Sequence, residues 1–139
     1  MKTRINKYIP LALDSIRNRL SRGANRVDAR YDGYAASLGP AIRTSGLRVA
    51  LSFYTDIHKN DADKPTDPRR HHILKVITEI LIADGLAIVN PERPEALLTQ
   101  VLQVWRNNNV AEQREIQQKI IDAVIAIKLS LRNFEQVKQ

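Results

Sequence analysis

Arginine is the residue type in this sequence that points most clearly to a chemistry. The first 48 of the 139 residues hold ten lysines or arginines, eight of them arginines, against three aspartates. The formal net charge of the whole chain is +7, so this N-terminal third carries all of the excess. Guanidinium groups pair bidentately with phosphate, and an uneven positive charge attracts polyanions. The basic third therefore indicates a polyanionic partner, which we interpret as nucleic acid ahead of an anionic membrane.

A basic surface that only keeps the protein soluble is the alternative interpretation of the same charge. Helical spacing favours contact with RNA, because Arg19 and Arg22 fall opposite the apolar stripe of the first expected helix. Arg26 joins this ridge if the helix continues, and acidic residues that would neutralise it are absent. The candidate nucleic-acid-binding residues are Arg19, Arg22, Arg26 and Arg30 first, and then Arg17, Arg43 and Arg48.

Catalytic chemistry has no comparable support in the sequence. A catalytic site needs a nucleophile with a base, paired carboxylates or metal ligands at workable spacing, and no such set is apparent. The chain has no cysteine and neither of the common phosphate-binding glycine loops. His58, His71 and His72 do not suit a metal, because adjacent helical residues diverge by about 100°. We expect no enzyme activity, no metal and no cofactor.

Apolar residues recur at helical spacing along most of the chain. This pattern predicts an all-α fold, a single domain over residues 1–139 with about five to six helices and a long C-terminal helix. The first helix is expected within residues 7–22; Pro10 places its start near Tyr8 or Ile9, and Ile9, Leu13, Ile16 and Leu20 form its core-facing stripe. No apolar run approaches the ~20 residues of a membrane span, and no signal peptide is apparent. We expect a soluble, cytoplasmic protein without a membrane partner.

Two helices are expected to meet at a fixed corner within residues 31–54. The first covers residues 27–38 and is interrupted by Gly39-Pro40; a single turn follows, and Gly46 begins the next helix. Gly46 suits a left-handed cap because it has no Cβ. Gly33 is expected to permit close contact with another helix. The aromatic residues here stand at helical spacing beside Leu and Ile, so core packing is favoured over base stacking for Tyr31, Tyr34, Phe53 and Tyr54.

Three further helices are expected after a polar loop over residues 58–68. The first begins at residue 67 or 68 and stops at 84–86, with Ile73, Val76, Ile77, Ile80 and Leu81 buried. The next has residues 94 and 95 in its first turn, stops at Asn107, and carries Trp105 as a core or interface anchor. The last runs from about 110 to 137, and its wide apolar stripe implies burial against several helices or another subunit.

The corner also resembles a known family. Its aromatic-rich helix is followed by x-L-x-P-x-I-x-x-x-G-L-x-x-A-L-x-F, here residues 37–42 leading to Gly46-Leu47, Ala50-Leu51 and Phe53. This pattern is similar to the small helical subunit of the type III-B (Cmr) CRISPR effector complex. Residues 127–134 are similar to the leucine, Lys/Arg and aromatic cluster at the end of that subunit, which adds Lys128 and Arg132 to the candidate RNA-binding residues.

The resemblance implies a non-catalytic subunit that acts in antiviral defence. Several copies would stack beside the other Cmr effector subunits and help to form the groove for guide and target RNA, contacting the RNA backbone. A helix-turn-helix DNA-binding regulator remains an alternative, since residues 42–54 place a glycine turn between helices, although Arg48 and Ser52 stand among apolar residues there. A helical adaptor that binds only protein is the other alternative, and an acidic partner would then cover its arginines.

Overall fold

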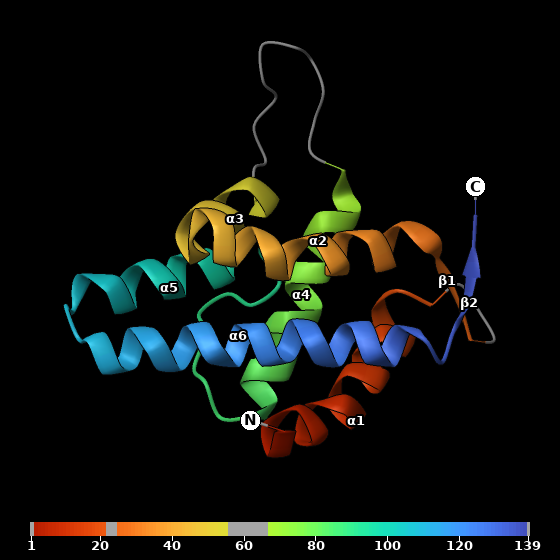
Figure 1. Cartoon of the computed structure of the whole chain (residues 1–139), viewed down its shortest axis with the longest axis horizontal. Helices are drawn as coiled ribbons and strands as arrows, with labels where there is room; N and C mark the ends of the chain where they lie inside the picture. The colour runs from red at the N-terminus through yellow and green to blue at the C-terminus, as the bar shows by residue number, and fades with distance from the viewer. Residues whose placement is uncertain (1, 22–24, 56–66, 139) are drawn as a thin grey trace, which may run out of the picture.

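The computed structural model describes residues 2–21, 25–55 and 67–138 of the chain. Six helices and two short strands lie within these ranges, and Figure 1 shows how they are arranged. The helices are α1 (Lys2–Arg19), α2 (Ala29–Ser45), α3 (Leu47–Thr55), α4 (Pro68–Ala83), α5 (Ala96–Arg106) and α6 (Val110–Leu131), and the strands are β1 (Arg26–Asp28) and β2 (Glu135–Val137). The prediction of an all-α fold with a long C-terminal helix is confirmed. None of the helices in these ranges combines the length and apolar character that a membrane crossing requires.

Helix α4 lies at the centre of the bundle and contacts each of the other five helices. Its buried side chains form one wide face of the helix: Ile73, Leu74, Val76, Ile77, Thr78, Ile80 and Leu81. A helix with so wide an apolar face must pack against several neighbours. In Figure 1, α3 lies near the N-terminal end of α4, α1 lies near its C-terminal end, and α6 runs across it. Lys75 and Glu79 lie on the remaining side of α4, which is partly exposed.

The boundaries of α4 follow the sequence signals. The carboxylate of Asp67 caps the first turn by accepting a hydrogen bond from the Arg69 amide, and Pro68 occupies the first helical position. The helix ends at Asp84, followed by Gly85 with φ 100°. Both predicted ends of α4 are confirmed, as is the end of α5 at Asn107. Helix α5 begins at Ala96, two residues later than expected.

Helix α2 runs without interruption through Gly39 and Pro40, so the predicted break there is wrong. Proline removes one helical hydrogen bond and costs about 3 kcal/mol in a helix interior. Leu38 and Ile42, buried on either side, hold the helix in place across this position. The break predicted at Gly46 is confirmed: its φ of 89° with ψ of 158° belongs to a region that is essentially restricted to glycine.

The predicted start of the first helix near Tyr8 or Ile9 is wrong, because α1 begins at Lys2, contains Pro10 in its interior and ends at Arg19. Its fully buried positions are Tyr8, Ala12 and Ile16, whereas Ile9 and Leu13 of the predicted stripe are only partly buried. The core-facing stripe is thus rotated by about one residue. Polar contacts explain this, because the Tyr8 hydroxyl donates to Asp84 Oδ2 over 2.7 Å and so faces α4.

The two strands were not predicted, and they correct the expected ends of two helices. β1 pairs in parallel with β2, with Arg26 opposite Glu135, so Val27 lies in a strand and not in a helix. Helix α6 ends at Leu131 instead of residue 137. The Gln136 side chain folds back and donates a hydrogen bond to the Leu131 carbonyl oxygen, satisfying one of the unpaired carbonyls at the helix end.

Gly33 does not mark a close helix contact, since a Cβ built at this exposed position has nothing within 4 Å. We predict that Gly33→Ala raises the free energy of unfolding by about 0.5–1 kcal/mol, because alanine is favoured in a helix interior. Gly46→Ala should lower it by about 1–3 kcal/mol, because the backbone there is strained for any L side chain.

Urea unfolding of the two variants beside wild type measures both effects. Equal effects of the two substitutions would contradict the assigned break at Gly46.

Candidate nucleic-acid interface

The predicted basic residues do not form one ridge. Of the nine, Arg22 lies outside the described residues, and the other eight are distributed over both ends of the bundle. Arg17 and Arg19 are on α1; Arg26, Arg30, Lys128 and Arg132 are near the paired strands; Arg43 and Arg48 flank the turn between α2 and α3. Arg26 leaves the expected ridge because α1 ends before it and β1 begins there.

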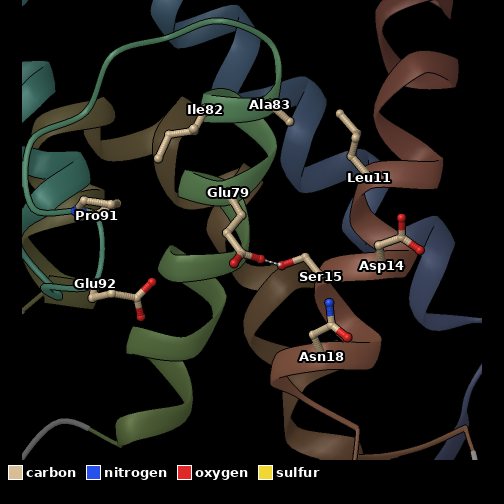
Figure 2. A pocket seen from close by; sticks show the side chains of 9 residues that line it. All are labelled: Leu11, Asp14, Ser15, Asn18, Glu79, Ile82, Ala83, Pro91 and Glu92. Carbon is tan, nitrogen blue, oxygen red and sulfur yellow. Dashed lines mark hydrogen bonds between the residues drawn. The ribbon is translucent and has the colours of Figure 1, made fainter.

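Arg19 faces carboxylates instead of solvent. Its guanidinium donates to Glu92 at 3.2 and 2.6 Å and lies 2.7 Å from Glu79 Oε2. Glu79 also accepts a hydrogen bond from the Ser15 hydroxyl, which links α1 to α4 (Figure 2). The expectation that acids are absent around the predicted ridge is therefore wrong at Arg19. The reason is that the neutralising carboxylates come from residues more than 50 positions away in the sequence.

These contacts change the acidity of both carboxyl groups. Hydrogen bonds from Arg19 lower the pKa of Glu92. Burial acts to raise the pKa of Glu79, but hydrogen bonds from Arg19 and Ser15 outweigh it, and the pKa is lowered. The same bonds raise the pKa of Arg19. The three side chains consequently form a charged link between α1, α4 and the segment before α5.

Four of the predicted cations surround the paired strands, and we name them the strand-end group: Arg26, Arg30, Lys128 and Arg132. Arg26 makes an ion pair of 3.2 Å with Glu135 across the strands, and both side chains are largely exposed. Such an exposed pair contributes little to stability. Arg30 and Arg132 are exposed, and no acidic side chain among the described residues pairs with them. Lys128 is partly buried in the last turn of α6.

A buried aspartate positions this end of α2. Asp28 is 3% exposed, caps α2 by accepting from the Arg30 amide at 2.9 Å, and accepts from Arg69 Nε at 2.9 Å. Burial acts to raise its pKa, but the amide bond and the charge of Arg69 outweigh burial and lower it. Arg69 also contacts Asp67, the cap of α4, at 3.1 Å. The strand-end group is thereby fixed to the N-terminal end of α4.

The remaining predicted cations lie at the other end of α2. Arg43 is exposed in the last turn of α2, and Arg48 is exposed in the first turn of α3. The Arg48 guanidinium lies 5.6 Å from the centroid of the Trp105 ring, a cation–π contact between α3 and α5. Trp105 is only partly buried, so it is an anchor at the surface of the bundle.

The sequence analysis missed a cluster around Arg70. Its guanidinium lies 4.9 Å from the ring centroids of Tyr34 and Phe53 and 5.8 Å from that of Tyr54. The predicted burial of Phe53 is wrong, because this side chain is 61% exposed; Tyr31 and Tyr54 are buried as expected, and Tyr34 is partly so. The sequence does indicate that Phe53 is exposed. The buried stripe of α3 is complete without it, since it consists of Leu47, Ala50, Leu51 and Tyr54, and Phe53 lies off this stripe.

No group of three or more His, Cys, Asp or Glu side chains suited to a metal ion occurs in the part of the chain described here. Of the three histidines that the sequence analysis considered and rejected as metal ligands, His58 lies outside the described residues. His72 Nδ1 is 2.7 Å from the Tyr31 hydroxyl, and burial lowers the pKa of this histidine. These contacts tie α2 to α4 and give His72 a packing role.

Comparison with protein families identifies the class of protein. Residues 4–128, from α1 into the last turn of α6, match the family model described as CRISPR-associated protein (Cas_Cmr5). The all-helical fold and this match define a CRISPR-associated protein. The chain belongs to the Cmr5 family of type III-B systems, as the resemblance predicted, and this makes it a Cmr-complex subunit. No curated protein and no solved structure matched the chain.

The Arg19 link predicts a specific dependence of stability on pH. A lowered carboxyl pKa means that the folded state holds fewer protons than the unfolded state, so stability falls as the pH drops below about 4.5. The substitution Arg19→Met should lower the free energy of unfolding by about 1 kcal/mol at neutral pH. Its stability should then fall less than that of wild type between about pH 5 and pH 3.

Arg17→Met is the matched control, because the ion pair that Arg17 makes with a described residue is an exposed one, 3.5 Å from Asp14. Its stability should follow the wild-type curve at each pH in urea unfolding. Parallel curves for Arg19→Met and wild type would contradict the link.

Proposed function

We propose that this chain is a non-catalytic, single-domain subunit of the cytoplasmic Cmr effector and that it lines the groove for guide and target RNA in antiviral defence. Several copies stack in the complex, and exposed arginines neutralise RNA phosphates without reading bases. One observation carries the proposal: a member of the Cmr5 family leaves several arginines exposed that no acidic side chain among the described residues neutralises.

The residues proposed for RNA contact separate into two groups by their surroundings. The first group is exposed and has no acidic partner among the described residues: Arg30, Arg43, Arg48 and Arg132. These arginines can contact phosphate without first breaking an ion pair. Arg17 and Arg26 need only release an exposed ion pair. Lys128 and Arg22 stay in the proposal on the grounds of the sequence. Arg19 can contribute only by leaving Glu79 and Glu92, which makes it the weakest of the nine.

Binding through phosphates alone has a clear signature. Each phosphate neutralised on a single strand releases counterions, and the logarithm of affinity falls with the logarithm of salt concentration by about 0.7 per contact. Phosphate contacts fix the position of a strand and carry no sequence information. The proposed subunit therefore binds RNA of any sequence, weakly when alone, and with steep salt dependence.

We predict that changing Arg30, Arg43 and Arg132 together to Gln weakens single-stranded RNA binding and reduces the salt slope by about 2, since three phosphate contacts are lost. The measurement is fluorescence anisotropy with labelled RNA across a series of salt concentrations. The matched control changes Arg93, Arg106 and Arg114 to Gln, which removes the same charge from positions outside the proposed set.

The assembled effector, reconstituted with each variant, provides the second measurement. A normal salt slope for the first variant, or the same loss for the control, would reject the assignment of these arginines to the RNA groove.

A further inference from the structure

Two surfaces of the described chain have opposite character and lie at opposite ends of α4. We name the first the aromatic face: Val49, Phe53 and Arg70. We name the second the acidic groove; it has a volume of about 400 Å³ and is lined by Leu11, Asp14, Ser15, Asn18, Glu79, Ile82, Ala83, Pro91 and Glu92 (Figure 2).

The aromatic face projects an apolar pair beside a fixed cation. Val49 and Phe53 are 60% and 61% exposed and stand four residues apart on α3, so they share one side of the helix. The Arg70 guanidinium stacks against the Phe53 ring, and its buried Nε has no hydrogen-bond partner. Arg70 is partly exposed, and no acidic side chain among the described residues pairs with it, so its charge remains for an incoming carboxylate to balance.

The acidic groove offers the complementary arrangement. Leu11, Ile82, Ala83 and Pro91 supply apolar walls, and Asp14 and Glu92 stand at the groove with largely exposed carboxylates. Figure 2 shows these side chains coming from α1, α4 and the segment before α5. The groove is lined by three carboxylates and no cation. Arg19 pairs with Glu79 and Glu92 and Arg17 pairs with Asp14 from beside the groove, so two cations balance three carboxylates and one net negative charge remains.

Placement sets the geometry of a contact between the two surfaces. Arg70 is in the first turn of α4, whereas Ile82 and Ala83 are in its last turn. A helix of 16 residues is about 24 Å long, so one molecule cannot bring its own two surfaces together. A contact between two different surfaces of identical molecules is heterologous. Repeating it gives a ring if the rotation between neighbouring copies closes a circle, and an open row of copies if it does not.

We propose that Phe53 of one copy of this chain inserts into the acidic groove of the next copy, with Arg70 facing Asp14 and Glu92. This inference rests on the stacking of copies in the proposed function and assigns the surfaces that make the contact. An aromatic residue in an apolar pocket beside an arginine is the composition of an interface hot spot. The carboxylates of the groove repel RNA phosphates, which favours a protein occupant.

Covalent capture in the assembled effector tests the contact directly, because the chain has no cysteine of its own. A mixture of Phe53→Cys and Ile82→Cys copies should form a disulfide-linked dimer of this chain under mild oxidation. Val110→Cys replaces Phe53→Cys in the control mixture, since Val110 is also exposed, at 57%, but lies outside both surfaces. Equal capture in both mixtures, or capture in neither, would overturn the proposal.

Charge exchange provides a second, independent readout in the isolated full chain. Arg70→Glu alone and Asp14→Arg alone each place like charges across the contact, so each should associate roughly tenfold more weakly than wild type in sedimentation velocity. A mixture of the two variants should associate again, because every contact then joins opposite charges. A mixture as weak as its components would overturn the proposal.

RNA binding separates this inference from the proposed function. Phe53→Glu should abolish capture and self-association while the isolated chain keeps its RNA affinity and salt slope. Loss of RNA affinity with intact self-association would assign the aromatic face to RNA and overturn the inference. If wild type and the mixture of Arg70→Glu with Asp14→Arg self-associate as expected but neither binds RNA, the proposed RNA groove fails and the contact between copies stands.

Discussion

Burial of the wide apolar face of α4 is the constraint on which the rest of this structure depends. Its apolar residues leave water because the other five helices pack around it, and each of them contacts it. Polar pairs then fix those helices along the length of α4. Arg69 joins Asp28 and Asp67 at the N-terminal end, and Asp84 joins Tyr8 and Lys7 at the C-terminal end. The two ends of α4 remain as the exposed, chemically distinct surfaces of the molecule.

Charge is separated along the sequence much more than it is in space. Acidic residues from the balanced part of the chain return to neutralise the basic N-terminus, as Asp122 does for Arg4, Glu79 for Arg19 and Glu135 for Arg26. Asp122 is fully buried and receives hydrogen bonds from Arg4 and Gln118, which fixes α1 to α6. The positive charge left exposed is therefore carried largely by other cations, such as Arg43 on α2 and Arg48 on α3.

The sequence was sufficient for features that depend on local backbone chemistry. Asp67 with Pro68, Gly46 and the asparagines after Arg106 mark helix ends correctly, because capping and positive φ are decided by neighbouring residues. Helix α2 passes through Pro40 because tertiary packing outweighs a local cost. The pairing of β1 with β2 and the carboxylates around Arg19 join residues far apart in sequence, so periodicity within one helix could not reveal them.

In the arrangement that we propose, exposed arginines face RNA while the α3 surface faces a neighbouring copy. Thiol alkylation tests both parts at once in the assembled effector, using single-cysteine variants at Arg30, Arg43, Arg132, Phe53 and Arg93. We expect that target RNA slows alkylation at positions 30, 43 and 132, that position 53 is protected with or without RNA, and that position 93 stays reactive. Protection at 53 that appears only with RNA, together with unchanged rates at 30, 43 and 132, would contradict this arrangement.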